Sequence, residues 1–348
     1  MLPGQGLRFY LTRFKNASFS ELIHRTRGAI LSFRLKALFG RGKLHLKIPA
    51  IDHAALKLLQ LPGFQYCVDV QVLESLLEGG VFALNEDTER IERFEEEWRG
   101  VFFADVRVPP SGFDIRMIWE PARLQHVTIL LLYAQINNGL PGMDRLRWVA
   151  KNAVLDWIEK NPFLSGPHYQ SAMECGLRIP VFVYALKILD NLPPSEQGRI
   201  LDAVYQHAWW ISRRLSLYSS LGNHTVCECA GLVFAGAIFR STTEGRTWMA
   251  RGLALLWQEL HHQILDDGGP AEQSFGYLRF ILDLYWLVID FLEKNRLHNC
   301  TDWKPRLVLG ENFLNAFQDA RGQVPAIGDT DDGYAVAPGI YPRRAIEI

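Results

Sequence analysis

Two segments of the 348-residue chain combine side chains that could bind an anion and transfer a proton. The first runs Gly-Asn223-His224-Thr-Val-Cys-Glu228 and predicts a helix start, with Asn223 as the capping residue. Glu228 lies one turn beyond His224 inside an apolar helix, where a carboxylate needs a partner. In the second segment, Gln273 and Tyr277 share one face of a predicted helix that follows a glycine-rich loop. Each segment alone is also compatible with a capping or packing role.

Two further segments pair a carboxylate with an arginine on one helix face. Glu120 and Arg123 are three residues apart, and Glu174 and Arg178 are four apart. A guanidinium matches planar anions well, so either arginine could bind a substrate carboxylate or sulfate. The alternative is that each arginine pairs with the glutamate of its own helix and holds helices together.

Taken together and in this order, the segments resemble the heparinase II/III-like polysaccharide lyases over about residues 110–335. The family shows a Trp-Glu-x-x-Arg helix, a Met-Glu-x-x-x-Arg helix, an Asn-His-x-x-x-Glu helix start, a Glu-x-Ser-x-x-Tyr segment and an Ile-Gly-Asp-x-Asp loop. Here these motifs read Trp119-Glu120-Pro-Ala-Arg123, Met173-Glu174-Cys-Gly-Leu-Arg178, Asn223-His224-Thr-Val-Cys-Glu228, Glu272-Gln-Ser274-Phe-Gly-Tyr277 and Ile327-Gly-Asp329-Thr-Asp331.

The resemblance implies cleavage of uronic-acid polysaccharides by β-elimination. The proton α to the uronate carboxyl is removed, the oxygen at C4 leaves, and the negative charge of the carboxylate must be neutralised. We assign that neutralisation to Asn223 and His224, whose place at a helix N-terminus also favours anions. Tyr277 matches the family's general acid and could also serve as the base, and the resemblance implies a histidine of the family's β-sandwich as the other possible base. For Tyr277, acting as a base would require nearby positive charge, which His224 or Arg279 could supply.

The remaining motif residues receive binding and supporting roles. The residues expected to contact substrate are Trp119, Arg123, Arg178, Gln273 and Arg279. The residues expected to orient them are Glu120, Glu174, Glu228 and Glu272, with Glu228 and Glu272 orienting His224 and the loop. No cofactor and no metal site are predicted, because hard cations take several oxygen ligands and the loop offers only Asp329 and Asp331.

The elements that must position these residues are helices. Helical periodicity runs through 20–38, 69–79, 87–98, 116–137, 144–160, 170–190, 195–215, 225–240, 245–265, 271–294 and 303–320. Helices that are apolar all round alternate with amphipathic ones, which predicts an inner ring of helices covered by an outer ring. The fold class is therefore all-α, an incomplete α/α toroid. The resemblance implies a β-sandwich after the toroid, and its residues, including a histidine that faces the cleft, are expected to be missing from this chain.

The predicted organisation is a basic helical segment over 1–50, the toroid over 51–335 and a linker over 336–348. Residues 1–50 hold ten Lys or Arg and one acid, a net charge of +9, whereas residues 69–105 carry a net −8. The two segments are expected to face each other, or the basic one to contact an anionic polymer or membrane surface. The five cysteines show no framework spacing and are expected to be buried apolar side chains.

The composition limits the classes of molecule that the protein is expected to bind. A net charge of −1 and the lack of a recognition pattern argue against nucleic acid, and no apolar stretch is long enough for a membrane span. The missing signal pattern favours the cytoplasm, whereas relatives that degrade external polymers are exported, so the compartment stays open. The expected partner is an anionic polysaccharide, whose identity the sequence does not determine.

Two other functions stay open at this stage. An α/α-toroid glycoside hydrolase would use two carboxylates, for which Glu120 and Glu272 could be proposed. That function would leave the Asn-His and Tyr positions without a chemical role. A protein that only binds anionic glycan, or assists polysaccharide assembly, would suit the basic N-terminal segment.

Overall fold

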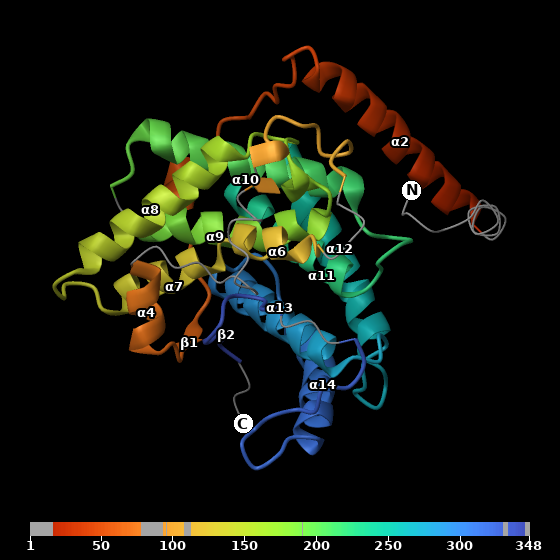
Figure 1. Ribbon diagram of the computed structural model, residues 1–348. Coiled ribbons are helices and arrows are strands. Elements are labelled where there is room, and N and C mark those ends of the chain that lie inside the picture. Colours follow the sequence, from red (N-terminus) through yellow and green to blue (C-terminus); the bar gives the residue numbers. More distant parts are fainter. Residues whose placement is uncertain are drawn as a thin grey trace.

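The computed structural model describes residues 17–77, 93–94, 96–107, 113–189, 191–329 and 333–344, and most of this part of the chain is helical (Figure 1). Four helices are buried along most of their length: α7 (Gln125–Ile136), α9 (Ala172–Ile188), α11 (Asn223–Ile238) and α13 (Phe275–Lys294). Three helices bury only one face: α8 (Met143–Lys160), α10 (Pro194–Arg214) and α12 (Thr243–Gln263).

The two sets alternate along the chain and form an inner and an outer layer. Inner helix α11 packs against inner helices α9 and α13 and against outer helix α12, while α9 packs against α7 and α10. An apolar stripe on each outer helix covers the inner layer, as Leu146, Ala150 and Val154 do at four-residue spacing on α8. The all-α, toroid-like arrangement expected from the sequence is confirmed.

Helices α9 and α11 cross at two glycines. A Cβ atom on Gly231 would lie 2.8 Å from the Cα of Gly176, and a Cβ on Gly176 would lie 2.6 Å from the backbone oxygen of Cys227. Only glycine allows the two backbones to approach this closely. The crossing brings the N-terminal ends of both helices, with Glu174 and Asn223, to the same side of the protein.

The helix expected over 116–137 is wrong as a single element. The structure has α6 (Arg116–Trp119), a 3-10 turn η1 (Pro121–Arg123) and then α7. Pro121 cannot donate the hydrogen bond of a continuous helix, and its ring would clash with the carbonyl four residues earlier. Leu124 then adopts a left-handed conformation with φ 59°, which redirects the chain into α7. The break determines where Arg123 points.

Of the other described elements, those at 19–39, 70–77 and 304–316 agree broadly with the expected positions, and the short ones at 53–58, 167–169 and 301–303 were not predicted as separate elements. These elements are α2 (Phe19–Phe39), α3 (His53–Leu58), α4 (Val70–Leu77), η2 (Pro167–Tyr169), η3 (Thr301–Trp303) and α14 (Lys304–Ala316). Most of the helix expected over 87–98 falls outside the described residues. The helix expected over 271–294 begins only at Phe275, because Ser274 caps it by accepting a hydrogen bond from the backbone nitrogen of Tyr277.

A two-stranded antiparallel sheet joins distant parts of the chain. Strand β1 (Phe64–Tyr66) pairs with β2 (Ile340–Pro342), and Ile340 is buried against the helical core. The described part of 336–348 therefore packs on the helical body. No helix among the described residues is long and apolar enough to cross a membrane.

Helix α2 projects from the body of the protein (Figure 1). Lys36 near its end donates a hydrogen bond of 2.6 Å to Asp105, which links the basic N-terminal segment to the acidic one. Most of the other α2 side chains are exposed or half-buried.

Candidate active site

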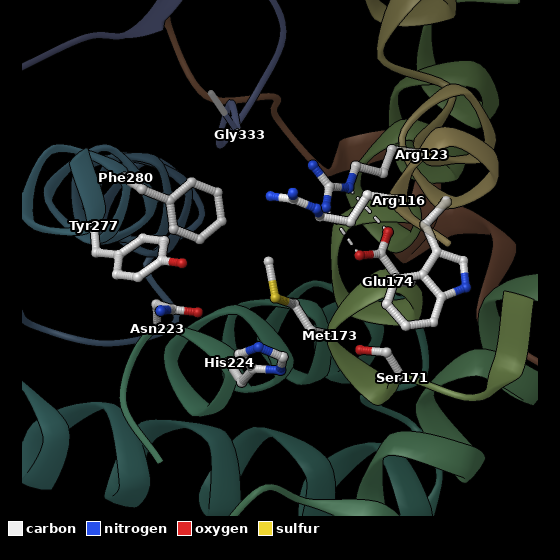
Figure 2. A pocket seen from close by; sticks show the side chains of 11 residues that line it. Arg116, Arg123, Ser171, Met173, Glu174, Asn223, His224, Tyr277, Phe280 and Gly333 are labelled. Atoms are coloured by element: carbon white, nitrogen blue, oxygen red, sulfur yellow. Dashed lines mark hydrogen bonds and ion pairs between the residues drawn. The ribbon is translucent and has the colours of Figure 1, made fainter. Parts of the chain in front are cut away.

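An open pocket of about 510 Å³, part of which merges with solvent, lies where the N-terminal ends of several helices meet. Its walls come from segments far apart in the chain (Figure 2). The lining residues are Arg116, Trp119, Arg123, Ser171, Met173, Glu174, Asn223, His224, Tyr277, Phe280 and Gly333. Six of the predicted site residues are among them: Trp119, Arg123, Glu174, Asn223, His224 and Tyr277.

Arg123 and Glu174 form a buried, two-pronged ion pair on one wall. The Nε and Nη2 atoms of Arg123 each donate a hydrogen bond of 2.9 Å to the carboxylate of Glu174, and the two side chains are 3% and 2% exposed. Burial opposes ionisation of Glu174, but the charge and hydrogen bonds of Arg123 outweigh it and hold the pKa of Glu174 below its usual value. The pair leaves a fixed guanidinium at the pocket surface.

Asn223 is the first residue of α11, and Gly222 takes the capping position that the sequence suggested for Asn223. The backbone nitrogen of Asn223 donates to Glu272 Oε1 at 2.7 Å, and its Nδ2 donates to Glu272 Oε2 at 2.8 Å. Burial raises the pKa of Glu272. Glu272 therefore orients Asn223, rather than His224 as expected from the sequence.

Tyr277 lies in the first turn of α13 and points its hydroxyl into the pocket (Figure 2). The hydroxyl donates a long hydrogen bond of 3.4 Å to Asp329 Oδ2. The loop that carries Asp329 is held against α13, because Ser274 Oγ donates to the backbone oxygen of Asp329 at 2.6 Å. Asp331 lies outside the described residues. Among the described residues, no three His, Cys, Asp or Glu side chains gather as metal ligands would.

His224 and Trp119 complete the predicted part of the pocket. His224 is half-buried beside Asn223, and its positive form would favour the ionised state of Glu174. Trp119 donates from its indole nitrogen to the backbone oxygen of Pro167 at 3.0 Å, which fixes the ring at the pocket wall.

Arg178, predicted to bind substrate, does not reach the pocket. Its side chain is 0% exposed, its Nε donates to His207 Nε2 at 3.0 Å, and its Nη2 donates to the backbone oxygen of His168 at 2.6 Å. The guanidinium also stacks 4.7 Å from the ring of Trp157. Burial lowers the pKa of both histidines, so they stay neutral around the arginine. Arg178 therefore holds the core between α9 and α10 together and is not placed to contact a substrate in the pocket, contrary to the expectation from the sequence.

Gln273 and Arg279, also predicted to contact substrate, do not line the pocket either. Gln273 is exposed in a left-handed conformation with φ 55°, on a loop whose backbone meets Gly328 closely. Arg279 is exposed on α13, and its charge acts on Asp283 and Glu311.

Two of the supporting glutamates, Glu228 and Glu120, do not line the pocket. Glu228 accepts hydrogen bonds from the backbone nitrogen of Ser216 at 2.8 Å and from its hydroxyl at 2.7 Å, so it holds the segment after α10 rather than His224. Burial raises the pKa of Glu228 to about 8 despite these hydrogen bonds. Glu120 is half-buried at the junction of α6 and η1 and is not a lining residue.

Sequence reasoning missed several lining residues, of which Arg116 has the clearest chemical potential. Its Nε donates to Asp114 at 2.8 Å, and its guanidinium points into the pocket beside Arg123 (Figure 2). A signal existed, because Arg116 precedes Trp119 by three residues and so lies near the same helix face. Phe280, three residues after Tyr277, and Ser171, three residues before Glu174, have the same spacing, and Met173 belongs to one of the motifs, whereas Gly333 has no such signal.

Comparison with known proteins finds a family similarity over the part of the chain that carries four of the predicted residues that line the pocket. The family described as Heparinase II/III N-terminus matches residues 143–303, which contain Glu174, Asn223, His224 and Tyr277. This part of the chain is therefore similar to the heparinase II/III family.

Members of this family are similar over parts of the chain. A heparin-sulfate lyase of Bacteroides stercoris is 34% identical over 87 residues, which are 25% of this chain and 13% of the relative. A heparin-sulfate lyase of Pedobacter heparinus is 26% identical over 137 residues, which are 37% of this chain and 20% of the relative. A crystal structure of heparinase III aligns with a TM-score of 0.57 at 16% identity and covers 85% of this chain and 47% of that one. The chain thus spans less than half the length of the relatives it matches, and the structural likeness concerns the fold.

Proposed function

We propose that this heparinase II/III-like protein acts in β-elimination of a uronate-containing anionic polysaccharide, with chemistry centred on Asn223, His224 and Tyr277. The observation that carries the proposal is that these three side chains, from α11 and α13, open on one pocket together with the guanidinium groups of Arg116 and Arg123.

The first requirement of the reaction is to neutralise the uronate carboxylate. The amide nitrogen of Asn223 carries two hydrogens and gives one to Glu272, so the other remains for a substrate oxygen. Because Glu272 also accepts from the backbone nitrogen, the amide is fixed before substrate binds. We assign His224 as the second donor to the carboxylate. Donors that are already oriented stabilise the charge that spreads from the carboxylate as the α-proton leaves.

The second requirement is proton transfer, which we assign to Tyr277. The C5–H bond breaks, its electron pair forms the C4–C5 double bond, and the C4–O bond breaks with its electrons on the leaving oxygen. The leaving oxygen takes the phenolic proton, and the phenolic oxygen takes the proton from C5, so the enzyme is unchanged. The contact with the Asp329 carboxylate disfavours a resting tyrosinate, which supports a protonated Tyr277 as the acid.

The cationic wall suits binding of the polymer. The buried carboxylate of Glu174 holds the Arg123 guanidinium in position, and Arg116 contacts Asp114 in a more exposed ion pair. We assign both to further anionic groups of the substrate, and the half-buried ring of Trp119 to the apolar face of a sugar.

The hydrolase alternative is less well supported. It needs two carboxylates that flank the scissile bond. Both oxygens of Glu272 are engaged by Asn223, and Glu120 does not line the pocket.

The test is ultraviolet absorbance during incubation with a panel of uronate polysaccharides, because elimination creates a conjugated unsaturated uronate and hydrolysis does not. Tyr277→Phe should lower turnover by about 10²-fold or more, a typical loss when a general acid or base is removed. Tyr341→Phe, at an exposed tyrosine on β2, is the matched control and should retain activity.

New reducing ends without absorbance would identify a hydrolase. Bound polysaccharide without either product would identify a glycan-binding protein. Equal activity of Tyr277→Phe and the control would remove Tyr277 from the mechanism.

A further inference from the structure

A second hollow adjoins the candidate active site. It holds about 1130 Å³, part of which is open to solvent, between α2 and the end of α10 with the segment 215–220 that follows it. Ser171 and His224 line both this hollow and the active-site pocket, so the two share a wall. His24, Arg25, Arg213 and Arg214 line it as well.

A smaller hollow continues along α2. It shares His24, Arg213 and Leu215 with the previous one and adds Arg27 from α2 and Arg251 from α12. We call the two hollows together the basic trough. Its further lining residues are Gly28, Ala29, Leu31, Gln170, Ala172, Ser212, Ser216, Leu217, Tyr218, Ser219 and Ser220.

Positive charge in the basic trough is not balanced by acids in its walls. No Asp or Glu is among its lining residues, within the part of the chain that the structure describes. Arg25 pairs with Glu21 at 2.5 Å, whereas Arg27, Arg214 and Arg251 have no ion pair within the described ranges.

The pKa of His24 is consistent with the same excess of positive charge. Burial lowers the pKa of His24, and the charges of Arg214, Arg251 and Arg25 lower it further. The buried carboxyl that acts on Arg214 is Glu228, whose pKa of about 8 leaves it largely protonated at neutral pH.

We propose that the basic trough binds the anionic groups of a polysaccharide chain that leaves the active-site pocket on the side of Ser171 and His224. This inference rests on the proposed function, because the pocket holds the sugar that reacts. It adds α2 to the substrate-binding surface and predicts that long chains bind better than short ones.

The shared wall favours a polysaccharide over a membrane as the occupant. A polymer that occupies the pocket must continue past one of its walls, and this wall opens on arginines with no acid among them. Exposed Phe19, Ile30 and Phe33 on α2 offer the competing possibility of an anionic lipid surface, which the experiment separates.

The experiment measures binding of heparan sulfate, as a polymer and as a tetrasaccharide, in a Tyr277→Phe background that leaves the ligand intact. Arg27→Gln with Arg251→Gln removes two exposed charges of the trough. Arg34→Gln with Arg145→Gln removes two exposed charges elsewhere and is the matched control, with circular dichroism as the check of folding for all variants. Two lost charge contacts should raise the Kd for the polymer about fivefold, with no change in the control.

The tetrasaccharide should bind equally to both double variants, because it fills only the pocket. Hyaluronan, which has carboxylates but no sulfates, replaces heparan sulfate in a parallel arm. A loss there too assigns the trough to carboxylates, and a loss with heparan sulfate alone assigns it to sulfates.

Three results would contradict the proposal that the basic trough binds polysaccharide. They are an equal loss of polymer affinity in the control variant, an equal loss of affinity for the tetrasaccharide, and no polymer binding at all. Loss of binding to phosphatidylserine vesicles with unchanged polymer binding would replace this proposal with a membrane surface. Turnover by the protein with Tyr277 intact is measured separately. If the trough variants bind the polymer less tightly but the protein forms no unsaturated product, only the proposed lyase activity is refuted. If unsaturated product forms but the trough variants bind the polymer normally, only the proposed role of the basic trough is refuted.

Discussion

Glu272 accepts both hydrogen bonds that Asn223 directs away from the pocket, at 2.7 Å from the backbone nitrogen and 2.8 Å from Nδ2. The two residues are 49 positions apart, and the contact ties the start of α11 to the loop before α13. The orientation of the amide that we assign to the substrate carboxylate thus depends on a residue that does not line the pocket.

The first prediction concerns this contact. Glu272→Gln replaces an acceptor by a donor, so the amide of Asn223 should rotate and the rate of unsaturated-product formation should fall about 10²-fold. Gln273→Asn, at the adjacent exposed residue, keeps a side chain that tolerates the left-handed backbone and should change the rate little. If Gln273→Asn loses as much activity as Glu272→Gln, Gln273 contacts substrate after all.

The second prediction concerns the buried pair of Arg123 and Glu174. Arg123→Met alone leaves an unpaired buried carboxylate and should lower the free energy of unfolding by about 3–5 kcal/mol. The double variant Arg123→Met with Glu174→Leu should lose clearly less than the sum of the two single variants, because no charge remains unpaired. Urea unfolding of the three variants gives the coupling energy.

An exposed ion pair provides the control for that series. Glu159 is 75% exposed and contacts Arg199 at 3.2 Å, so Glu159→Gln should cost less than about 1 kcal/mol. Additive losses at Arg123 and Glu174 would contradict the coupling.

The third prediction concerns the crossing of α9 and α11. Gly231→Ala would place a methyl group 2.8 Å from the Cα of Gly176, so the helices must separate and unfolding should become easier by about 1–3 kcal/mol. Gly198→Ala, in α10 with no atom within 4 Å of the added Cβ, should instead stabilise by about 0.5–1 kcal/mol. Thermal unfolding of both variants measures the difference, and a neutral Gly231→Ala would refute the tight crossing.

The fourth prediction is a pH dependence caused by Glu228. Its pKa rises from 4.5 to about 8 in the folded protein, so between these values the folded state holds a proton that the unfolded state has released. The stability this proton supplies is complete below about pH 4.5 and is lost as pH rises towards 8. The free energy of unfolding should therefore decline by up to about 1 kcal/mol per pH unit in that window from this group.

Glu228→Gln should remove that contribution, because a neutral amide of the same shape can still accept from the Ser216 backbone nitrogen. Urea unfolding at pH 5, 6.5 and 8 should show that the free energy of unfolding of the variant increases relative to that of the unsubstituted protein as pH rises. Glu74→Gln, at an exposed residue of α4, is the matched control. Its free energy of unfolding should depend on pH in the same way as that of the unsubstituted protein. A constant difference for Glu228→Gln would show that Glu228 is ionised throughout.

The sequence by itself determined the helical architecture and six of the residues that line the pocket. Apolar periodicity is a local property, and it separated inner helices such as α11 from outer ones such as α8. The motif order pointed to Asn223, His224 and Tyr277, which are 53 or 54 positions apart across α11 and α13 and yet line one pocket.

Only the tertiary structure decided which charged groups meet. Periodicity tells which face a residue occupies but not which neighbour covers that face, so Arg123 and Arg178 looked equivalent. The break at Pro121 and Leu124 turns Arg123 to Glu174 at the pocket, while the α9–α10 interface encloses Arg178 between two neutral histidines. The same reason explains why Glu272 holds Asn223 and why Arg116 was missed: both contacts join segments that come together only when the helices pack.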